Sequence, residues 1–336
     1  MRVVLFDRNQ VGKESSWAGG GIVSPLFPWR YSSAVSALSH ESQSFYPNLI
    51  EQLLAETNID AQLHKTGLFW LDLDDQKEAL DWAFQFRKEI FPVSVDQVLN
   101  LEPGLGLPFS QAIYMPDAAN VRNPLLIKAL RKALEQKANV KIKEHCAVVR
   151  LLQESNKITG VLTSDGKYTA DKVVLSAGAW SQSLLMTLGR SIPIEPMKGQ
   201  MILYKCDSGF LSHMVLANGR YVLPRKDGYI LVGSTLERVG FDTIPTQKAC
   251  EQLEVFAETL IPALRGKPLK AHWAGVRPGS PDGVPIIGEM PDINGLWLNC
   301  GHYRNGVVLA PASCNLLVDL MLKRSPKINH HLYAVT

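Results

Sequence analysis

The chain has 336 residues and a mass of 37.2 kDa, with 46% hydrophobic residues, 20% charged residues and a net charge of +3. This composition is ordinary for a globular protein and excludes a disordered chain, a collagen and a coiled-coil rod. The near-neutral charge gives no sign of a nucleic-acid partner, and no apolar run reaches the ~18 residues that a membrane helix needs.

The first third of the chain has the pattern of an α/β protein, with a strand followed by helices. Val3 to Phe6 form a short apolar run that predicts a buried strand ending at Asp7, and a Gly-rich segment follows at 18–21. Apolar residues at helical spacing predict helices over 32–56 and 75–91.

The middle of the chain continues with one helix and several strands. Asn123-Pro124 opens the helix, since an N-cap residue and a proline in the first turn are typical of a helix start. Strands are predicted at 140–144, 147–153, 158–163 and 173–177.

The pattern changes after residue 196. Short β runs up to residue 240, with a hairpin turn at 226–228, indicate an antiparallel unit. A helix over 246–260 follows, and the tail returns to a strand at 295–300 and a helix at 307–322. The sequence therefore predicts an α/β unit that is interrupted by a mixed, partly antiparallel unit.

Three segments have a composition that suits the binding of a ligand or cofactor. The loop 301–306, Gly-His-Tyr-Arg-Asn-Gly, precedes a helix whose N-terminus attracts anions, although an ordinary turn would look similar. Arg277 lies among Gly, Pro and Trp, where its planar fork can bind a carboxylate or pin a loop through backbone carbonyls. The apolar strand within 171–181 runs into small residues, which allows a flat cofactor to approach but also fits a generic buried strand.

Together these segments resemble the FAD-dependent amine oxidoreductases of the D-amino-acid oxidase superfamily, with the glycine oxidases of thiamine biosynthesis as the nearest branch. Segments like 173–181, 275–288 and 301–311 recur in that family in this order, and Tyr221–Arg225 is a further family signal. The resemblance covers nearly the whole chain. It implies an α/β fold with a Rossmann-like FAD-binding domain and a mixed, largely antiparallel β substrate domain.

The resemblance also implies a domain division. The FAD-binding domain is expected to be discontinuous, and the substrate-binding domain fills the gaps between its pieces. The expected ranges are 1–30, 120–195 and 286–336 for the first and 31–119 and 196–285 for the second.

The start of the chain departs from the family pattern. The family has a first strand and a GxGxxG turn before the strand that carries the acid, and here that acid-bearing strand begins at residue 3. Without a first strand, its neighbours are expected to separate and to leave unpaired edges. Two explanations are open: a gene product that begins ~25 residues upstream, in line with the motif spacing, or a degenerate relative that binds FAD weakly. We favour the first, because the catalytic residues of the family are retained.

The resemblance assigns roles to individual residues. Arg277 would bind the substrate carboxylate, Tyr221 would assist with its hydroxyl, and Arg304 would lie near flavin and substrate, so these three are the predicted catalytic residues. Asp7 would hold the adenosine ribose. The full set of predicted FAD contacts is Asp7, Ala18, Gly19, Gly20, Gly21, Val148, Ala177, Gly178, Trp180, Gly301, His302, Asn305, Gly306 and Val307. No metal is expected.

The implied reaction is the oxidation of glycine or another small amino acid or amine to the oxo acid, ammonia and hydrogen peroxide, with dioxygen as acceptor. The imine could instead feed thiamine thiazole synthesis. One alternative is a D-amino-acid dehydrogenase that passes electrons to a quinone, and another is a flavin-less, non-catalytic remnant. A sarcosine oxidase lacks support because no counterpart of its covalent flavin cysteine is found, and the oxidase domain of a tRNA-modifying enzyme would predict a basic face.

The remaining expectations concern assembly and compartment. The family often forms homotetramers, so a homo-oligomer is expected by resemblance. Five widely spaced cysteines without a CxxC pair argue against a disulfide framework or a zinc site and favour a reducing compartment, so we expect a cytoplasmic protein.

Overall fold

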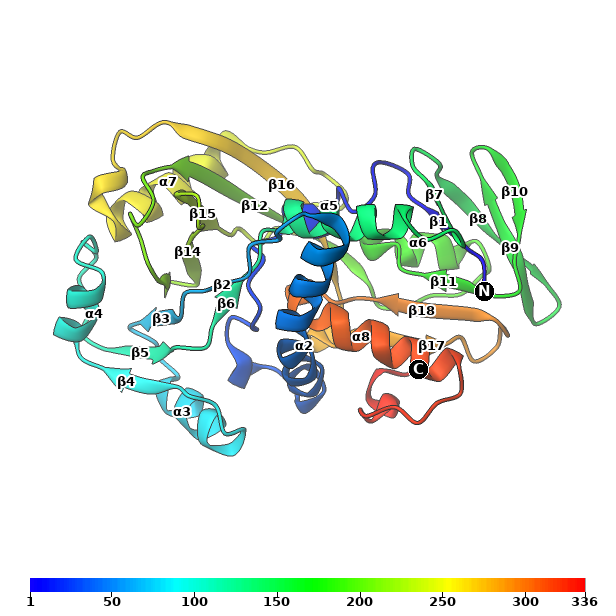
Figure 1. Ribbon diagram of the computed structural model, residues 1–336, viewed down its shortest axis with the longest axis horizontal. Coiled ribbons are helices and arrows are strands. Elements are labelled where there is room, and N and C mark those ends of the chain that lie inside the picture. The colour runs from blue at the N-terminus through cyan, green and yellow to red at the C-terminus, as the bar shows by residue number, and fades with distance from the viewer. Residues whose placement is uncertain (336) are drawn as a thin grey trace.

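The computed structural model describes residues 1–335, so residue 336, the last of the predicted range 286–336, lies outside the described residues. A large sheet occupies one side of the molecule and several small sheets the other, with helix α2 (Ser33–Thr57) between them (Figure 1). This α/β arrangement of mixed sheets and helices agrees with the predicted fold class.

The large sheet has eight strands in the order β16-β12-β15-β14-β13-β3-β5-β4. Its strands are β3 (Leu68–Leu71), β4 (Phe91–Val93), β5 (Ala112–Met115), β12 (Glu195–Lys205), β13 (Met214–Ala217), β14 (Arg220–Pro224), β15 (Tyr229–Gly233) and β16 (Leu269–Gly279). All neighbouring pairs are antiparallel except β13 with β3. The predicted hairpin at 226–228 is confirmed, because β14 and β15 pair directly across it.

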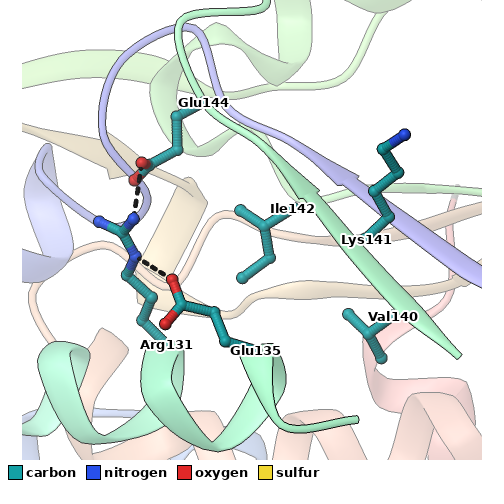
Figure 2. Close-up of a pocket in the computed structure, with 6 residues that line it drawn as sticks. All are labelled: Arg131, Glu135, Val140, Lys141, Ile142 and Glu144. Carbon is teal, nitrogen blue, oxygen red and sulfur yellow. Dashed lines mark hydrogen bonds and ion pairs between the residues drawn. The ribbon is translucent and has the colours of Figure 1, made fainter. Parts of the chain in front are cut away.

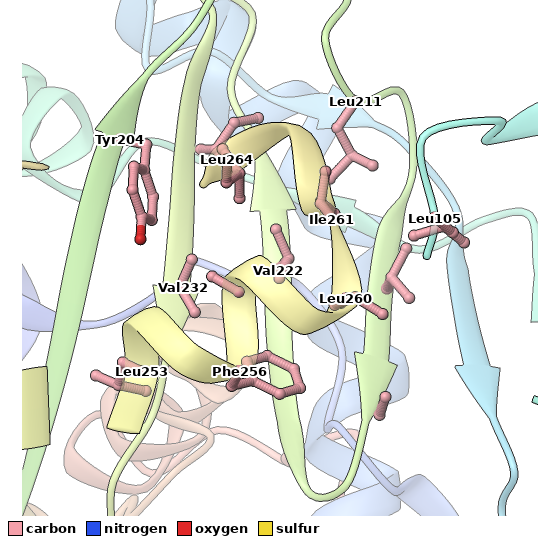
Figure 3. Packing of buried hydrophobic residues seen from close by; sticks show 14 of the residues in the cluster. Leu105, Tyr204, Leu211, Val222, Val232, Leu253, Phe256, Leu260, Ile261 and Leu264 are labelled. Carbon is pink, nitrogen blue, oxygen red and sulfur yellow. The ribbon is translucent and has the colours of Figure 1, made fainter. Parts of the chain in front are cut away.

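Helix α7 (Gln247–Leu260) covers one face of this sheet. Its buried Leu253, Phe256 and Leu260 pack onto residues of the strands such as Val222 and Val232 (Figure 3). The helix begins where the side chain of Thr246 accepts a hydrogen bond from the amide of Ala249, which is a typical N-cap. The opposite face of the sheet carries a second core that includes Trp70 and Tyr221.

The smaller sheets hold the remaining strands. They are β1 (Val3–Phe6) with β7 (Val140–Lys143); β8 (Val148–Glu154), β9 (Lys157–Thr163) and β10 (Gly166–Thr169); β11 (Val173–Leu175), β18 (Leu296–Cys300) and β17 (Ile286–Glu289); and β2 (His64–Lys65) with β6 (Ala119–Asn120). Within residues 1–335 no ladder joins β1 to β11, so the parallel pairs β1–β7 and β11–β18 belong to separate sheets. Val4 and Val174 on these strands are accordingly exposed.

Helix α2 packs against α5 (Asn123–Glu135) and α8 (Gly306–Met321), and these helices share a core. The other α-helices are α1 (Ser15–Ala18), α3 (Gln76–Gln85), α4 (Val95–Leu101) and α6 (Ser181–Met186). Among the described helices, none is both long enough and apolar enough to span a bilayer. The strands of the large sheet come from both ranges predicted for the substrate domain, 31–119 and 196–285. Helix α2 belongs to the first of these ranges but packs outside the large sheet. The domain boundaries remain a prediction.

Most predicted elements are confirmed with bounds shifted by a few residues. The helix predicted over 75–91 is wrong in its second half, because α3 ends at Gln85. Arg87 adopts a left-handed backbone with φ 51°, which a continuing α-helix does not allow. The following residues, Phe91 to Val93, then join the edge of the large sheet as β4.

Candidate active site

Three segments that are distant in the sequence meet on the side of the large sheet opposite α7. Trp273 of β16 donates its indole N–H to the carbonyl of Ala18 (3.0 Å), and the hydroxyl of Ser15 donates to the carbonyl of Val276 (2.6 Å). The tail loop reaches the same strand, since the amide of Tyr303 donates to the carbonyl of Pro278 (3.0 Å). These bonds hold the Gly-rich segment 18–21 and the tail loop against the part of β16 that carries Arg277.

Arg277 is held by neutral acceptors only. Its Nη2 donates to Ser234 Oγ (2.8 Å), and its Nη1 donates to the carbonyls of Thr235 (3.3 Å) and Lys198 (3.4 Å). Burial lowers the pKa of its guanidinium, but an arginine remains a cation at neutral pH. No carboxylate of residues 1–335 forms an ion pair with it, so its charge is available to an anionic ligand.

Gly199 on the neighbouring strand makes room for this guanidinium. A Cβ atom at that position would lie 2.2 Å from both terminal nitrogens of Arg277. The strand β12 therefore requires a residue without a side chain at the point where the arginine crosses it.

Tyr221 places its hydroxyl against the Gly-rich segment. The side chain is 5% exposed, and a Cβ atom on Gly20 would lie only 2.5 Å from its hydroxyl oxygen. Burial raises the pKa of this phenol, while the cations of Arg277, Arg304 and Arg225 oppose the rise. The phenol is therefore neutral near pH 7 and can donate a hydrogen bond to a ligand carboxylate.

The tail loop ends at the N-terminus of α8, as the sequence predicted. Asn305 is 4% exposed, and its amide nitrogen has no hydrogen-bond partner among residues 1–335. His302 Nε2 lies 3.1 Å from Ser313 Oγ, and burial lowers the pKa of its imidazole to about 4, so the ring is neutral at pH 7. The loop therefore offers donors and a helix N-terminus, but no cationic histidine, to a bound group.

The predicted contacts at the other end of the cofactor lie on separate elements. Asp7, directly after β1, accepts hydrogen bonds from the amides of Asn9 (2.9 Å) and Gly12 (3.3 Å). Val148 is the first residue of β8, and Ala177 and Gly178 lie in the turn after β11.

Trp180 is enclosed between two side chains. The guanidinium of Arg8 lies 3.4 Å from its ring centroid, and the ring of Phe241 stacks on it with centroids 5.3 Å apart. The roles of Trp180 and of the contacts on β1, β8 and the turn after β11 remain predictions.

The donors behind the Gly-rich segment are functional candidates that the sequence did not indicate. The carbonyls of residues 18–21 accept hydrogen bonds in order from Trp273, Asn123, Arg225 and the amide of Val121. The amides of residues 19–21 have no acceptor among residues 1–335. Arg225 stands in the Tyr221–Arg225 segment that marked the family, but its sequence context alone gave no sign that it would reach Gly20.

A surface pocket between α5 and β7 lies outside this group of segments (Figure 2). Arg131 at its rim pairs with Glu135 (2.9 Å) and Glu144 (2.9 Å), so its charge is already compensated. The residues that resemble catalytic groups are all elsewhere, and we assign no function to this pocket.

Comparison with known proteins places this arrangement in a family. A family model described as FAD dependent oxidoreductase matches residues 1–320. A glycine oxidase of Pseudomonas putida is 56% identical over 333 residues, which cover 99% of this chain and 91% of that protein. A protein of Synechocystis named "Bifunctional protein ThiO/ThiG" is 37% identical over 235 residues, which cover 68% of this chain and 35% of that protein.

Solved structures of oxidases are also similar to this chain. The crystal structure of glycine oxidase from Geobacillus kaustophilus matches with a TM-score of 0.93 and 28% identity, covering all of this chain and 92% of that one. An iminodiacetate oxidase from Chelativorans matches with a TM-score of 0.87 at 24% identity and supports the fold alone.

Proposed function

The chain belongs to the FAD-dependent oxidoreductase family, and from that premise we propose that it oxidises glycine, or another small amino acid, at the α carbon. The observation that carries this proposal is the meeting of Arg277, Tyr221 and Gly20 in one place. A carboxylate-binding cation and a neutral phenol there adjoin a backbone segment that has no side chains. A small amino acid whose carboxylate is bound on Arg277 and Tyr221 would lie directly beside that segment.

The residues present fit a flavin at this position. Gly20 lies so close to Tyr221 that a methyl group would not fit, and the carbonyls of 18–21 are bonded, whereas the amides of 19–21 have no acceptor among residues 1–335. The buried amide nitrogen of Asn305, without a partner among residues 1–335, and the N-terminus of α8 suit a polar, electron-rich ring edge. We therefore propose that segment 18–21 and loop 301–306 contact the isoalloxazine ring.

The chain's own residues bind and orient the substrate. Arg277 binds the carboxylate, and Tyr221 donates a hydrogen bond to it, which directs the α carbon toward segment 18–21. Bound FAD supplies the two-electron acceptor for the hydride of the α carbon. The amine binds in its neutral form, so that no side chain needs to remove a proton during the transfer.

His302 is not required as a base in this proposal, because its ring is neutral and partnered with Ser313. Hydrolysis of the imine gives glyoxylate and ammonia, and reduction of dioxygen gives hydrogen peroxide. One glycine, one dioxygen and one water thus yield one of each product. The similarity to proteins named ThiO/ThiG supports a place in thiamine synthesis, where the imine itself would be consumed.

The test is the visible spectrum of the chain purified with FAD and mixed with glycine without oxygen. We expect flavin bands that bleach, and peroxide in stoichiometric amount when air is admitted. Bleaching without peroxide would point to a quinone acceptor, and a flavin that stays oxidised would exclude glycine as the substrate. A chain without flavin bands would contradict the proposed function altogether.

A variant separates substrate binding from flavin binding. Arg277→Met should keep the flavin spectrum and raise the KM for glycine ~100-fold, because a charge-assisted hydrogen bond contributes about 1.5–3 kcal/mol. Arg265→Met, at an arginine whose side chain is 73% exposed, is the control and should leave the KM unchanged. An unaltered KM in Arg277→Met would show that the carboxylate binds elsewhere.

A further inference from the structure

Arg225 is a buried cation without an acidic partner. It follows β14 directly and is 9% exposed, and its guanidinium donates hydrogen bonds to three neutral acceptors. Nη1 donates to Asn120 Oδ1 (2.8 Å) and to the carbonyl of Val121 (2.6 Å), and Nη2 donates to the carbonyl of Gly20 (2.9 Å). No carboxylate of residues 1–335 forms an ion pair with it. A buried charge of this kind is costly unless something compensates it.

The charged groups that face Arg225 do not balance it. Burial lowers the pKa of its guanidinium to about 10, and the neighbouring cation of Arg122 acts in the same direction. The phenol of Tyr221 and the carboxylate of Asp227 act in the opposite direction, but the phenol is neutral near pH 7 and the carboxylate is engaged in an ion pair with Arg122. Arg225 therefore remains charged at neutral pH without an ion-pair partner among residues 1–335.

The hydrogen bonds of Arg225 distinguish it from the other two arginines near Tyr221. The cations of Arg277, Arg304 and Arg225 all act on the phenol of Tyr221. Arg225 reaches the Gly-rich segment through the carbonyl of Gly20. Its hydrogen bond therefore acts directly on the segment against which we place the flavin.

We propose that Arg225 is a positioning residue that makes the flavin easier to reduce, by fixing the carbonyl of Gly20 and by placing an uncompensated positive charge behind the flavin contact. The inference rests on the flavin position in the proposed function. A guanidinium bonded to the Gly20 carbonyl polarises that peptide group, which strengthens the amide of Gly21 as a donor. A reduced flavin carries more negative charge than an oxidised one, so a cation in a low-dielectric environment stabilises the reduced form.

The sharpest test keeps Arg225 and gives its positive charge a carboxylate partner. Asn120→Asp replaces the amide oxygen 2.8 Å from Nη1 by a carboxylate of nearly the same volume, which pairs the cation without opening a cavity. The two contacts of the Asn120 amide nitrogen, to His64 and Thr66, are both 3.5 Å long and contribute little. Arg225→Lys keeps the charge but not the planar fork, and so separates charge from hydrogen-bond geometry.

Two measurements are made on each variant. The first is the melting temperature of the flavin-free protein, which should rise in Asn120→Asp because a buried unpaired charge gains a partner. The second is the two-electron reduction potential of the FAD-loaded protein, determined by equilibration with a redox dye. We expect Asn120→Asp to shift the reduction equilibrium at least tenfold toward oxidised flavin, which is about 30 mV. Arg225→Lys should remain close to the wild type.

The control is Arg220→Gln, which removes one positive charge from the other end of the same strand, where Arg220 is half-buried and donates a hydrogen bond to the carbonyl of Gln252. Its potential should match that of the wild type. A flavin-free Asn120→Asp protein that is no more stable than the wild type would overturn the premise of an unpaired charge. A stabilised variant whose potential equals that of the control would overturn the effect on the flavin while leaving the proposed function intact. Failure of the wild type to hold flavin would overturn both, and the spectrum alone would show it.

Discussion

The contact between Gly20 and Tyr221 makes a testable link between the predicted flavin and substrate sites. Gly20→Ala would place a methyl carbon 2.5 Å from the hydroxyl oxygen and 3.1 Å from the ring carbon Cζ of Tyr221. The backbone of Gly20 is outside the left-handed region, so alanine introduces no backbone strain there. The effect of the substitution is therefore the displacement of Tyr221.

The size of the displacement follows from the distances. The hydroxyl must move by about 0.9 Å to reach an ordinary contact of 3.4 Å, and the ring has little room because Tyr221 is 5% exposed and packed in a core. A misplacement of about 1 Å in a reacting complex can cost on the order of 100-fold in rate. We expect Gly20→Ala to lower kcat/KM for glycine by ~30- to 100-fold on that basis.

The assay is steady-state oxidation of glycine together with titration of FAD into the flavin-free protein. Gly104→Ala is the matched control, since a Cβ atom there meets nothing within 4 Å. In the Tyr221→Phe background the hydroxyl is gone and the nearest remaining atom is 3.1 Å away, so the same alanine should cost only a few-fold, which a double-mutant cycle measures. An equal loss in both backgrounds would refute the reasoning, because the damage would then not pass through the phenol.

Two further predictions concern stability. Leu253→Ala on α7, at a fully buried position of the core, should lower the free energy of unfolding by ~2–5 kcal/mol in urea titrations. The control is Val255→Ala, 65% exposed on the same helix, which should change that free energy by less than ~0.5 kcal/mol. Equal losses in the two variants would contradict the assigned packing. Burial lowers the pKa of His302 to about 4, so between that value and an ordinary ~6.5 the unfolded chain binds a proton that the folded chain excludes, and stability should fall as the pH falls through this window. His302→Gln should flatten this part of the urea-midpoint profile relative to the surface variant His331→Gln, and an unchanged slope would count against the assignment.

The candidate site could be predicted from the sequence as far as local motifs reach. Arg277 and Arg304 stand in segments whose Gly and Pro content is unusual, and Tyr221 belongs to a strand with a family signal. The structure brings Arg277 and Arg304 close enough to act on the phenol of Tyr221, and brings Tyr221 against Gly20. The extent of the helix predicted over 75–91 could not be predicted, because Phe91 to Val93 became a strand only through pairing with β5.

The sequence by itself predicted the long helices α2, α5, α7 and α8 and the antiparallel hairpin of β14 and β15, and it marked Arg277 as a candidate for binding a carboxylate. These features depend on residues that are neighbours in the chain, whose spacing and turn chemistry are visible without a structure. Only the tertiary structure decided that Arg225 bonds Asn120 and Gly20, because these partners lie 105 and 205 positions away along the chain. Hydrogen bonds over such separations depend on how the sheet and the Gly-rich segment pack, and no local pattern encodes that.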